Sequence, residues 1–172
     1  FAKWMDTLVV TEDAVSTSAN GVRYANSGQG RVLGGELLVR IHPKGRLFGW
    51  LAYTLSRSER RHDSTSSWQS FQYDQTHILS ALAGYDLGKG WEIGARYRLV
   101  SGDLYTPYVG GTLDLDAGVY APVGAREPFS ARMPLFHRMD LRIDKKFEFS
   151  HWKLIAYLDI QNVYSNRSPE LA

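Results

Sequence analysis

The sequence predicts an all-β protein, an antiparallel up-and-down meander of the kind that forms part of a transmembrane β-barrel. Apolar and polar residues alternate with a period of two far more often than with the 3.6-residue period of a helix. The connections between the alternating segments are short and long in turn. The chain has no run of 18 consecutive apolar residues, which excludes a transmembrane helix, whereas a transmembrane strand needs only about 9–11 residues.

Seven segments show the alternation and are expected to be strands. They are 1–10, 29–41, 46–58, 73–87, 91–103, 134–149 and 152–164. Most are longer than the roughly 5–6 residues that are typical of strands in soluble sheets. Their length suits a tilted membrane-spanning strand with an extension beyond the bilayer.

The connections separate into two classes. Tight turns are expected at HPKG (42–45), GKG (88–90) and SH (150–151), and long loops at 11–28, 59–72 and 104–133. In an antiparallel meander this alternation places all tight turns at one end and all long loops at the other, as in outer-membrane barrels. A soluble up-and-down barrel, or an ordinary sheet with one face in water, would show the same pattern.

The stretch HRMDLRIDKKFEF (137–149) has a charged residue at every second position from 138 to 148 and mostly apolar residues between them. In a membrane barrel the apolar face of such a strand contacts lipid and the charged face lines the interior. We expect a ladder of opposite charges on that interior face, in which most members pair with one another and some could contact a plug or a substrate. Its members are Arg96, Arg98, Arg138, Asp140, Arg142 and Asp144, with Asp159 as a further neighbour.

Aromatic residues gather beside the three tight turns, where a membrane boundary would lie. They are Phe48, Trp50, Tyr85, Trp91, Phe147, Phe149 and Trp152. Lys145 interrupts the apolar face near one of these turns and is expected to extend its amine toward lipid headgroups.

A basic cluster is expected in the second long loop, formed by Arg57, Arg60, Arg61 and His62 with Glu59 and Asp63 nearby. One interpretation is that it attracts an anionic ligand. The other is that it is a solvated loop base that could bind the phosphates of lipopolysaccharide. The sequence alone leaves both open.

Motifs for catalysis or metal binding are missing from the sequence. The five histidines are scattered, there is no cysteine, and no nucleophile elbow or phosphate-binding loop occurs. Asp114 and Asp116 lack the rest of a calcium-loop pattern. The 20 basic and 18 acidic residues are interleaved, which argues against a nucleic-acid partner. We therefore expect no enzyme activity, no cofactor and no metal site.

Four stretches resemble, in the same order, the C-terminal barrel region of TonB-dependent outer-membrane receptors. They are GRVLGGELLVR (30–40), GWLAYTLSRSERR (49–61), FQYDQTHILSALAGYDLGKGWEIGARYRLVSGDLYTP (71–107) and FHRMDLRIDKKFEFSHWKLIAYLDIQNVYSNRSPE (136–170). The motifs YxLSRS, YDQTH, LR-x-DK and YLD-x-QN-x-Y carry most of the resemblance.

The resemblance implies a barrel of about 22 strands, filled by a plug domain, in the bacterial outer membrane. Such receptors import scarce nutrients, namely siderophores or metal chelates, vitamins or glycans, with energy delivered by the TonB complex. Residues 1–172 would then be a partial barrel, about seven strands long, without plug or final strand. The implied partners are the missing strands and plug, outer-membrane lipid or lipopolysaccharide, and the TonB complex through the absent N-terminal part. A passive porin, an adhesion barrel and a soluble lipocalin-like barrel are the alternatives.

Overall fold

The computed structural model describes residues 1–12, 23–42, 45–116 and 118–167. These residues form twelve β-strands and no helix, so the all-β prediction is confirmed. The strands are β1 (Ala2–Glu12), β2 (Arg23–Ile41), β3 (Leu47–Arg61), β4 (Gln69–Ser70), β5 (His77–Gly88), β6 (Trp91–Val100), β7 (Leu104–Tyr105), β8 (Tyr108–Asp114), β9 (Val119–Gly124), β10 (Ala131–Arg132), β11 (Phe136–Glu148) and β12 (Lys153–Ile160). The described part of the chain contains no helix long and apolar enough to cross a membrane.

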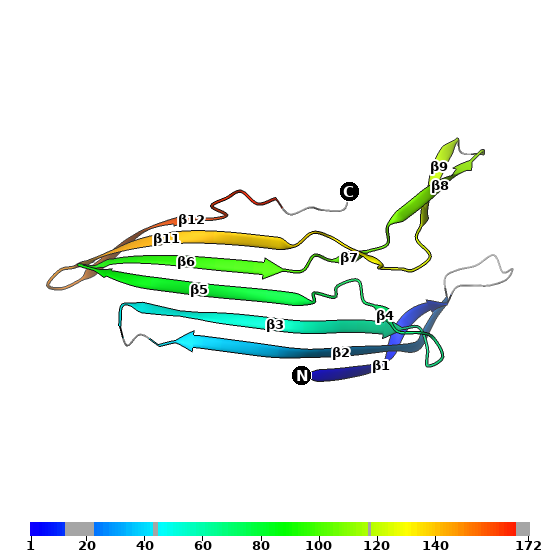
Figure 1. The fold of residues 1–172 in the computed structure, drawn as a ribbon, viewed down its shortest axis with the longest axis horizontal. Coiled ribbons are helices and arrows are strands. Elements are labelled where there is room, and N and C mark those ends of the chain that lie inside the picture. The colour runs from blue at the N-terminus through cyan, green and yellow to red at the C-terminus, as the bar shows by residue number, and fades with distance from the viewer. Residues whose placement is uncertain (13–22, 43–44, 117, 168–172) are drawn as a thin grey trace. The chain divides into compact units, whose positions relative to one another are not determined.

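The main sheet follows the chain. Its strand order is β1-β2-β3-β5-β6-β11-β12, with β4 paired to β3 (Figure 1). Every strand pair with a described register is antiparallel, which confirms the predicted meander. Strands β1 and β12 stand at the two ends of this order, so the sheet of the described residues is open. Two small sheets, β10-β7 and β8-β9, arise within the connection between β6 and β11.

The chain divides into two compact units. The first unit comprises Phe1–Gly34, Ser56–Gln75 and Asp103–Met133, and the second comprises Gly35–Leu55, Thr76–Gly102 and Pro134–Ala172. The first unit therefore holds most of each long connection that is described, and the second holds the tight turns.

The register of the second unit sorts its side chains into two faces. Asp140 lies opposite Arg96, Arg96 opposite Leu82, and Leu82 opposite Trp50. Because directly opposed residues of antiparallel strands project to the same side of the sheet, these four share the charged face. The residues between them form the apolar face, which carries Leu51, Leu79, Ala83, Ala95, Ile93, Leu141, Ile143, Leu154, Leu158 and Ile160.

The aromatic residues beside the tight turns lie on both faces of the sheet. Tyr85, Trp91 and Phe147 lie on the apolar face, as a girdle would require, whereas Phe48 and Trp50 lie on the charged face and cannot belong to one. On the charged face Phe48 lies opposite a glycine, Gly84. The ring of Phe48 occupies the space that a Cβ at Gly84 would take, so it covers bare backbone.

Lys145 contacts the aromatic residues and the turn at this end of the second unit. Its Nζ donates to the carbonyl oxygen of Lys89 at 2.7 Å and lies 5.0 Å and 5.4 Å from the ring centroids of Trp91 and Phe147. The amine is thus held by a backbone acceptor and two ring faces. The turn that accepts it has positive φ at Gly88, Lys89 and Gly90, as a tight hairpin requires.

Several strand boundaries differ from the sequence prediction. β2 already begins at Arg23 and β3 continues to Arg61, so the predicted loops 11–28 and 59–72 are wrong at these ends. The third loop, 104–133, contains four short strands rather than none. Backbone pairing extends β2 and β3 into polar segments that carry no apolar alternation, which is why the pattern missed these strand ends. The tight turn 42–45 lies partly outside the described residues.

The sheet has almost no protein core. Val100 and Leu104 are the buried apolar residues of the described chain. On the apolar face of the second unit, Ile93 is 42% exposed and Leu158 is 59% exposed. The described residues therefore leave large apolar side chains uncovered on a single-layered sheet.

Candidate functional site

The charge ladder centres on Asp140 of β11. Its Oδ2 lies 2.6 Å from Nη2 of Arg96, and its Oδ1 lies 3.1 Å from Nε of Arg138. Asp140 is only 5% exposed, whereas about half of the Arg96 side chain reaches solvent. Two guanidinium groups thus compensate one buried carboxylate, as a buried charge requires.

Further ion pairs continue along the same face. Nη2 of Arg142 lies 2.7 Å from Oδ1 of Asp144, and Nζ of Lys146 lies 2.7 Å from Oε2 of Glu92. The guanidinium of Arg142 also stands 4.0 Å above the ring of Tyr157 on β12. The predicted pairing inside the ladder therefore exists, although two of its pairs join residues two apart on β11 rather than neighbouring strands.

Arg98 differs from the other members of the ladder. It lies directly opposite Arg138 in the register of β6 and β11, so two like charges face one another. In the described part of the chain Arg98 has no ion-pair partner, and the carboxylate of Asp140 pairs with Arg96 instead. Arg98 is the least compensated cation of this face.

A shallow cavity of about 400 Å³ runs along the ladder within the second unit, between Phe48 on one side and Asp159 on the other. Positive and negative side chains on this face balance. On β5, β6, β11 and β12 they are Arg96, Arg98, Arg138, Arg142, Lys146 and Lys153 against Asp86, Glu92, Asp140, Asp144, Glu148 and Asp159. A self-neutralised wall can line a water-filled or protein-filled interior without a counter-charge from its occupant.

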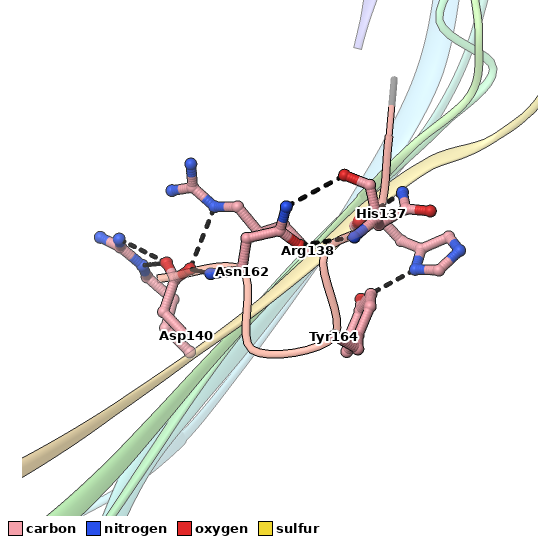
Figure 2. A network of polar contacts seen from close by, with 7 residues as sticks. His137, Arg138, Asp140, Asn162 and Tyr164 are labelled. Carbon is pink, nitrogen blue, oxygen red and sulfur yellow. Dashed lines mark hydrogen bonds and ion pairs between the residues drawn. The ribbon is translucent and has the colours of Figure 1, made fainter. Parts of the chain in front are cut away.

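A polar clasp that the sequence pattern did not predict holds the segment after β12 against β11 (Figure 2). The backbone N–H of Asn162 donates to Oδ1 of Asp140 at 2.9 Å. Asn162 and Asn166 exchange two side-chain to backbone hydrogen bonds of 3.0 Å, and Nδ2 of Asn166 donates to the carbonyl oxygen of His137 at 2.8 Å. The ring of His137 is hydrogen-bonded through Nδ1 to the hydroxyl of Tyr164, also at 2.8 Å.

The clasp explains why the last predicted strand, 152–164, is too long. β12 ends at Ile160, and Asn162 and Ser165 adopt positive φ angles of 50° and 51°. Asn tolerates this left-handed conformation better than most residues, so QN is a stop signal that the alternation concealed. Partial desolvation raises the pKa of Tyr164 above its ordinary value.

The predicted basic cluster does not form one patch. Arg57 and Arg61 occupy alternate positions on one face of β3 together with Glu59, whereas Arg60 projects from the other face and stacks 3.6 Å from the ring centroid of Phe71. The hydroxyl of Ser27 donates a hydrogen bond to the backbone carbonyl oxygen of His62, so this contact does not involve the imidazole ring. The prediction of a single loop cluster is wrong because these arginines belong to a strand.

Two residues that the sequence analysis overlooked complete the cluster of the first unit. Nη2 of Arg31 lies 2.6 Å from Oε2 of Glu59, and Nη2 of Arg57 lies 2.8 Å from Oε1 of the same carboxylate. The guanidinium groups of Arg31 and Arg61 lie 4.4 Å and 4.6 Å from the ring centroid of Trp68. Only strand pairing brings Arg31 to β3, so no local signal could have found it.

Asp63 caps the turn that follows β3. Its Oδ1 accepts hydrogen bonds from the backbone and hydroxyl of Thr65 and of Ser66, at 2.6 to 3.0 Å. These bonds lower the pKa of Asp63 from 3.8 to about 2. Its role is therefore to order the turn, rather than to complete a basic patch.

Comparison with known proteins adds no relative to this geometry. No family model, no curated protein and no solved structure matches the chain. The features that bear on function are therefore the two faces of the sheet and the two charged clusters.

Proposed function

We propose that this chain is a wall segment of an outer-membrane β-barrel belonging to a TonB-dependent receptor, which takes up a scarce nutrient with energy from the TonB complex. One observation carries the proposal: a single-layered sheet with an uncovered apolar face opposite a face of self-paired charges. The imported nutrient would be a siderophore or other metal chelate, a vitamin or a glycan.

The apolar face needs a cover. Burying apolar surface gains about 25 cal/mol per Å², so a sheet that leaves side chains such as Ile93 and Leu158 half exposed to water would forfeit most of its folding energy. Lipid acyl chains supply that cover over the whole face at once. A soluble barrel would instead enclose this face, and it would have to place the ladder around Asp140 in water, where ion pairs contribute little.

The charged face suits the interior of such a barrel. Its ion pairs are made within the wall, so they do not depend on what fills the interior. The order of short and long connections supports the same orientation, because outer-membrane barrels carry short turns on the periplasmic side and long loops outside. The long connections would then be the place of ligand capture.

Active import, as opposed to passive diffusion, is supported by the sequence motifs that resemble TonB-dependent receptors. A decisive experiment expresses the natural gene product in bacteria, fractionates the cells, and follows nutrient uptake with and without a proton-motive force. The expected result is recovery in urea-washed outer membranes and uptake that stops when the force is collapsed. Recovery in the aqueous fraction would contradict the membrane assignment, whereas uptake that persists without the force would favour a porin.

A further inference from the structure

One cluster of side chains in the first unit contains more cations than anions. On one face of β3 and its neighbour, Arg31 and Arg57 pair with the carboxylate of Glu59, and Arg31 and Arg61 share the ring of Trp68. The charged face of the second unit, by contrast, has as many anions as cations on β5, β6, β11 and β12. Together, Arg31, Arg57, Arg61 and Glu59 carry a net charge of +2, and such a basic cluster attracts an anionic partner.

The three arginines are held in place before any partner arrives. Glu59 is only 6% exposed, and its two carboxylate oxygens form separate ion pairs with Arg31 and Arg57. Trp68 lies under the guanidinium planes of Arg31 and Arg61, and Nε of Arg61 donates to Oε1 of Gln29 at 2.7 Å. Fixed guanidinium groups recognise phosphate well, because little side-chain entropy is lost when their planar N–H donors engage its oxygens.

The cluster is open to its surroundings and has an aromatic neighbour. The Arg57 side chain is 71% exposed, so most of its N–H groups remain available beyond the bond to Glu59. Trp4 of β1 lies directly opposite Arg31 in the register, on the same face, and is 66% exposed. Exposed Trp beside Arg is the combination found where a protein meets the headgroup layer of a membrane.

The sequence of β3 places this cluster at the end of an apolar stripe. Its odd-numbered residues are apolar or aromatic through Leu51, Tyr53 and Leu55, apart from Gly49, and become charged from Arg57 onward. Alternate residues of one strand share a face, and in the sequence of this strand the change from apolar to basic residues suits an amphipathic ligand with an anionic headgroup. We propose that Arg31, Arg57 and Arg61 bind the phosphate groups of a membrane glycolipid.

This inference rests on the proposed outer-membrane function and adds a partner and a site to it. The test uses the protein extracted from membranes in detergent, with a bisphosphorylated diglucosamine lipid titrated into the micelles and bound lipid counted by native mass spectrometry. Arg57→Gln should weaken binding about fivefold, the contribution of one basic residue near an anionic membrane surface. Arg57→Gln combined with Arg61→Gln should weaken it about 25-fold if the two contributions add.

Arg60→Gln is the matched control, because it removes the same charge from the adjacent position on the opposite face of β3. It should bind the glycolipid like the wild type. Arg57→Gln alone suffices if the double variant fails to fold, since Arg57 is largely exposed and Glu59 keeps its bond to Arg31. Heat-dependent gel mobility checks the fold of each variant.

Four results would overturn the inference. Equal weakening of glycolipid binding by Arg60→Gln would mean that the attraction is diffuse and not specific to this face. Equal affinity for the dephosphorylated lipid would mean that the phosphate groups are not recognised. Displacement of the glycolipid by low concentrations of inorganic phosphate would make soluble phosphate the ligand. Recovery of the protein without detergent would refute the proposed function itself, while a membrane-embedded protein that binds no glycolipid would refute only this inference.

Discussion

At the scale of single residues, Asp140 connects more parts of the second unit than any other described carboxylate. It pairs with Arg96 and Arg138 and accepts the backbone N–H of Asn162, so one side chain joins β6, β11 and the clasp. Sequence alternation predicted Asp140 as a ladder residue. It did not predict the clasp, because the partner is a backbone group brought in by a turn.

Asp140→Asn should destabilise the folded protein by about 1–3 kcal/mol, since it removes the charge that compensates two arginines and weakens the bond to Asn162. This loss of stability is at the lower end of the range for buried ion pairs, because Arg96 is half exposed. Urea unfolding in detergent measures the change. Asp159→Asn, on exposed β12, is the control and should stay within about 0.5 kcal/mol; an equal loss in both variants would argue against a special role for Asp140.

Asp63 provides a residue-scale prediction about pH. The pKa of Asp63 is about 2 in the folded turn and 3.8 without the hydrogen bonds. Its contribution to the stability of the folded protein is therefore complete above about pH 4 and is lost as the pH falls toward 2. Side-chain carboxyl NMR of the folded protein should show Asp63 titrating near 2. A midpoint near 4 would mean that the bonds from Thr65 and Ser66 do not persist in solution, and Asp63→Asn should remove the low titration altogether.

At the scale of elements, the close fit between β3 and β5 depends on a glycine. Gly84 faces Phe48 on one neighbouring strand and Gly94 on the other, but only Gly84 has a ring above it. Aromatic residues often cover a strand glycine in this way. The sequence analysis assigns Phe48 to the girdle because it lies beside a tight turn, and neither periodicity nor composition reveals that a glycine stands opposite it.

Gly84→Ala should destabilise the sheet by about 1–3 kcal/mol, because the new methyl group meets the Phe48 ring and forces it aside. Gly94→Ala is the matched control: its Cβ would approach the carbonyl oxygen of Ala83 no closer than 3.8 Å, so it should be neutral or slightly stabilising. Thermal unfolding in detergent compares the two. The assignment of Phe48 to this position fails if both variants behave alike.

At the scale of the whole molecule, the two faces of the sheet decide where the protein resides. Ile143→Arg, on the apolar face, should cost roughly 2–4 kcal/mol if that side chain faces mid-bilayer lipid. Arg142→Gln, the neighbouring position on the charged face, should cost less. Unfolding of the protein in lipid vesicles measures both, and a milder effect at Ile143 than at Arg142 would reverse the assignment of the faces.

The sequence by itself determined the all-β class and the antiparallel meander. In strands with clear alternation it also determined which residues share a face, because side-chain period and turn chemistry are local properties. Only the tertiary structure decided which charges pair, that Arg57 and Arg60 lie on opposite faces, that Arg31 and Trp68 complete the basic cluster, and that the chain turns at Asn162 to clasp Asp140. The contact of Arg96 with Asp140 joins residues 44 positions apart, and that of Asp140 with Asn162 joins residues 22 positions apart. Both depend on strand register. Register depends on the energy of the whole sheet rather than on any one segment.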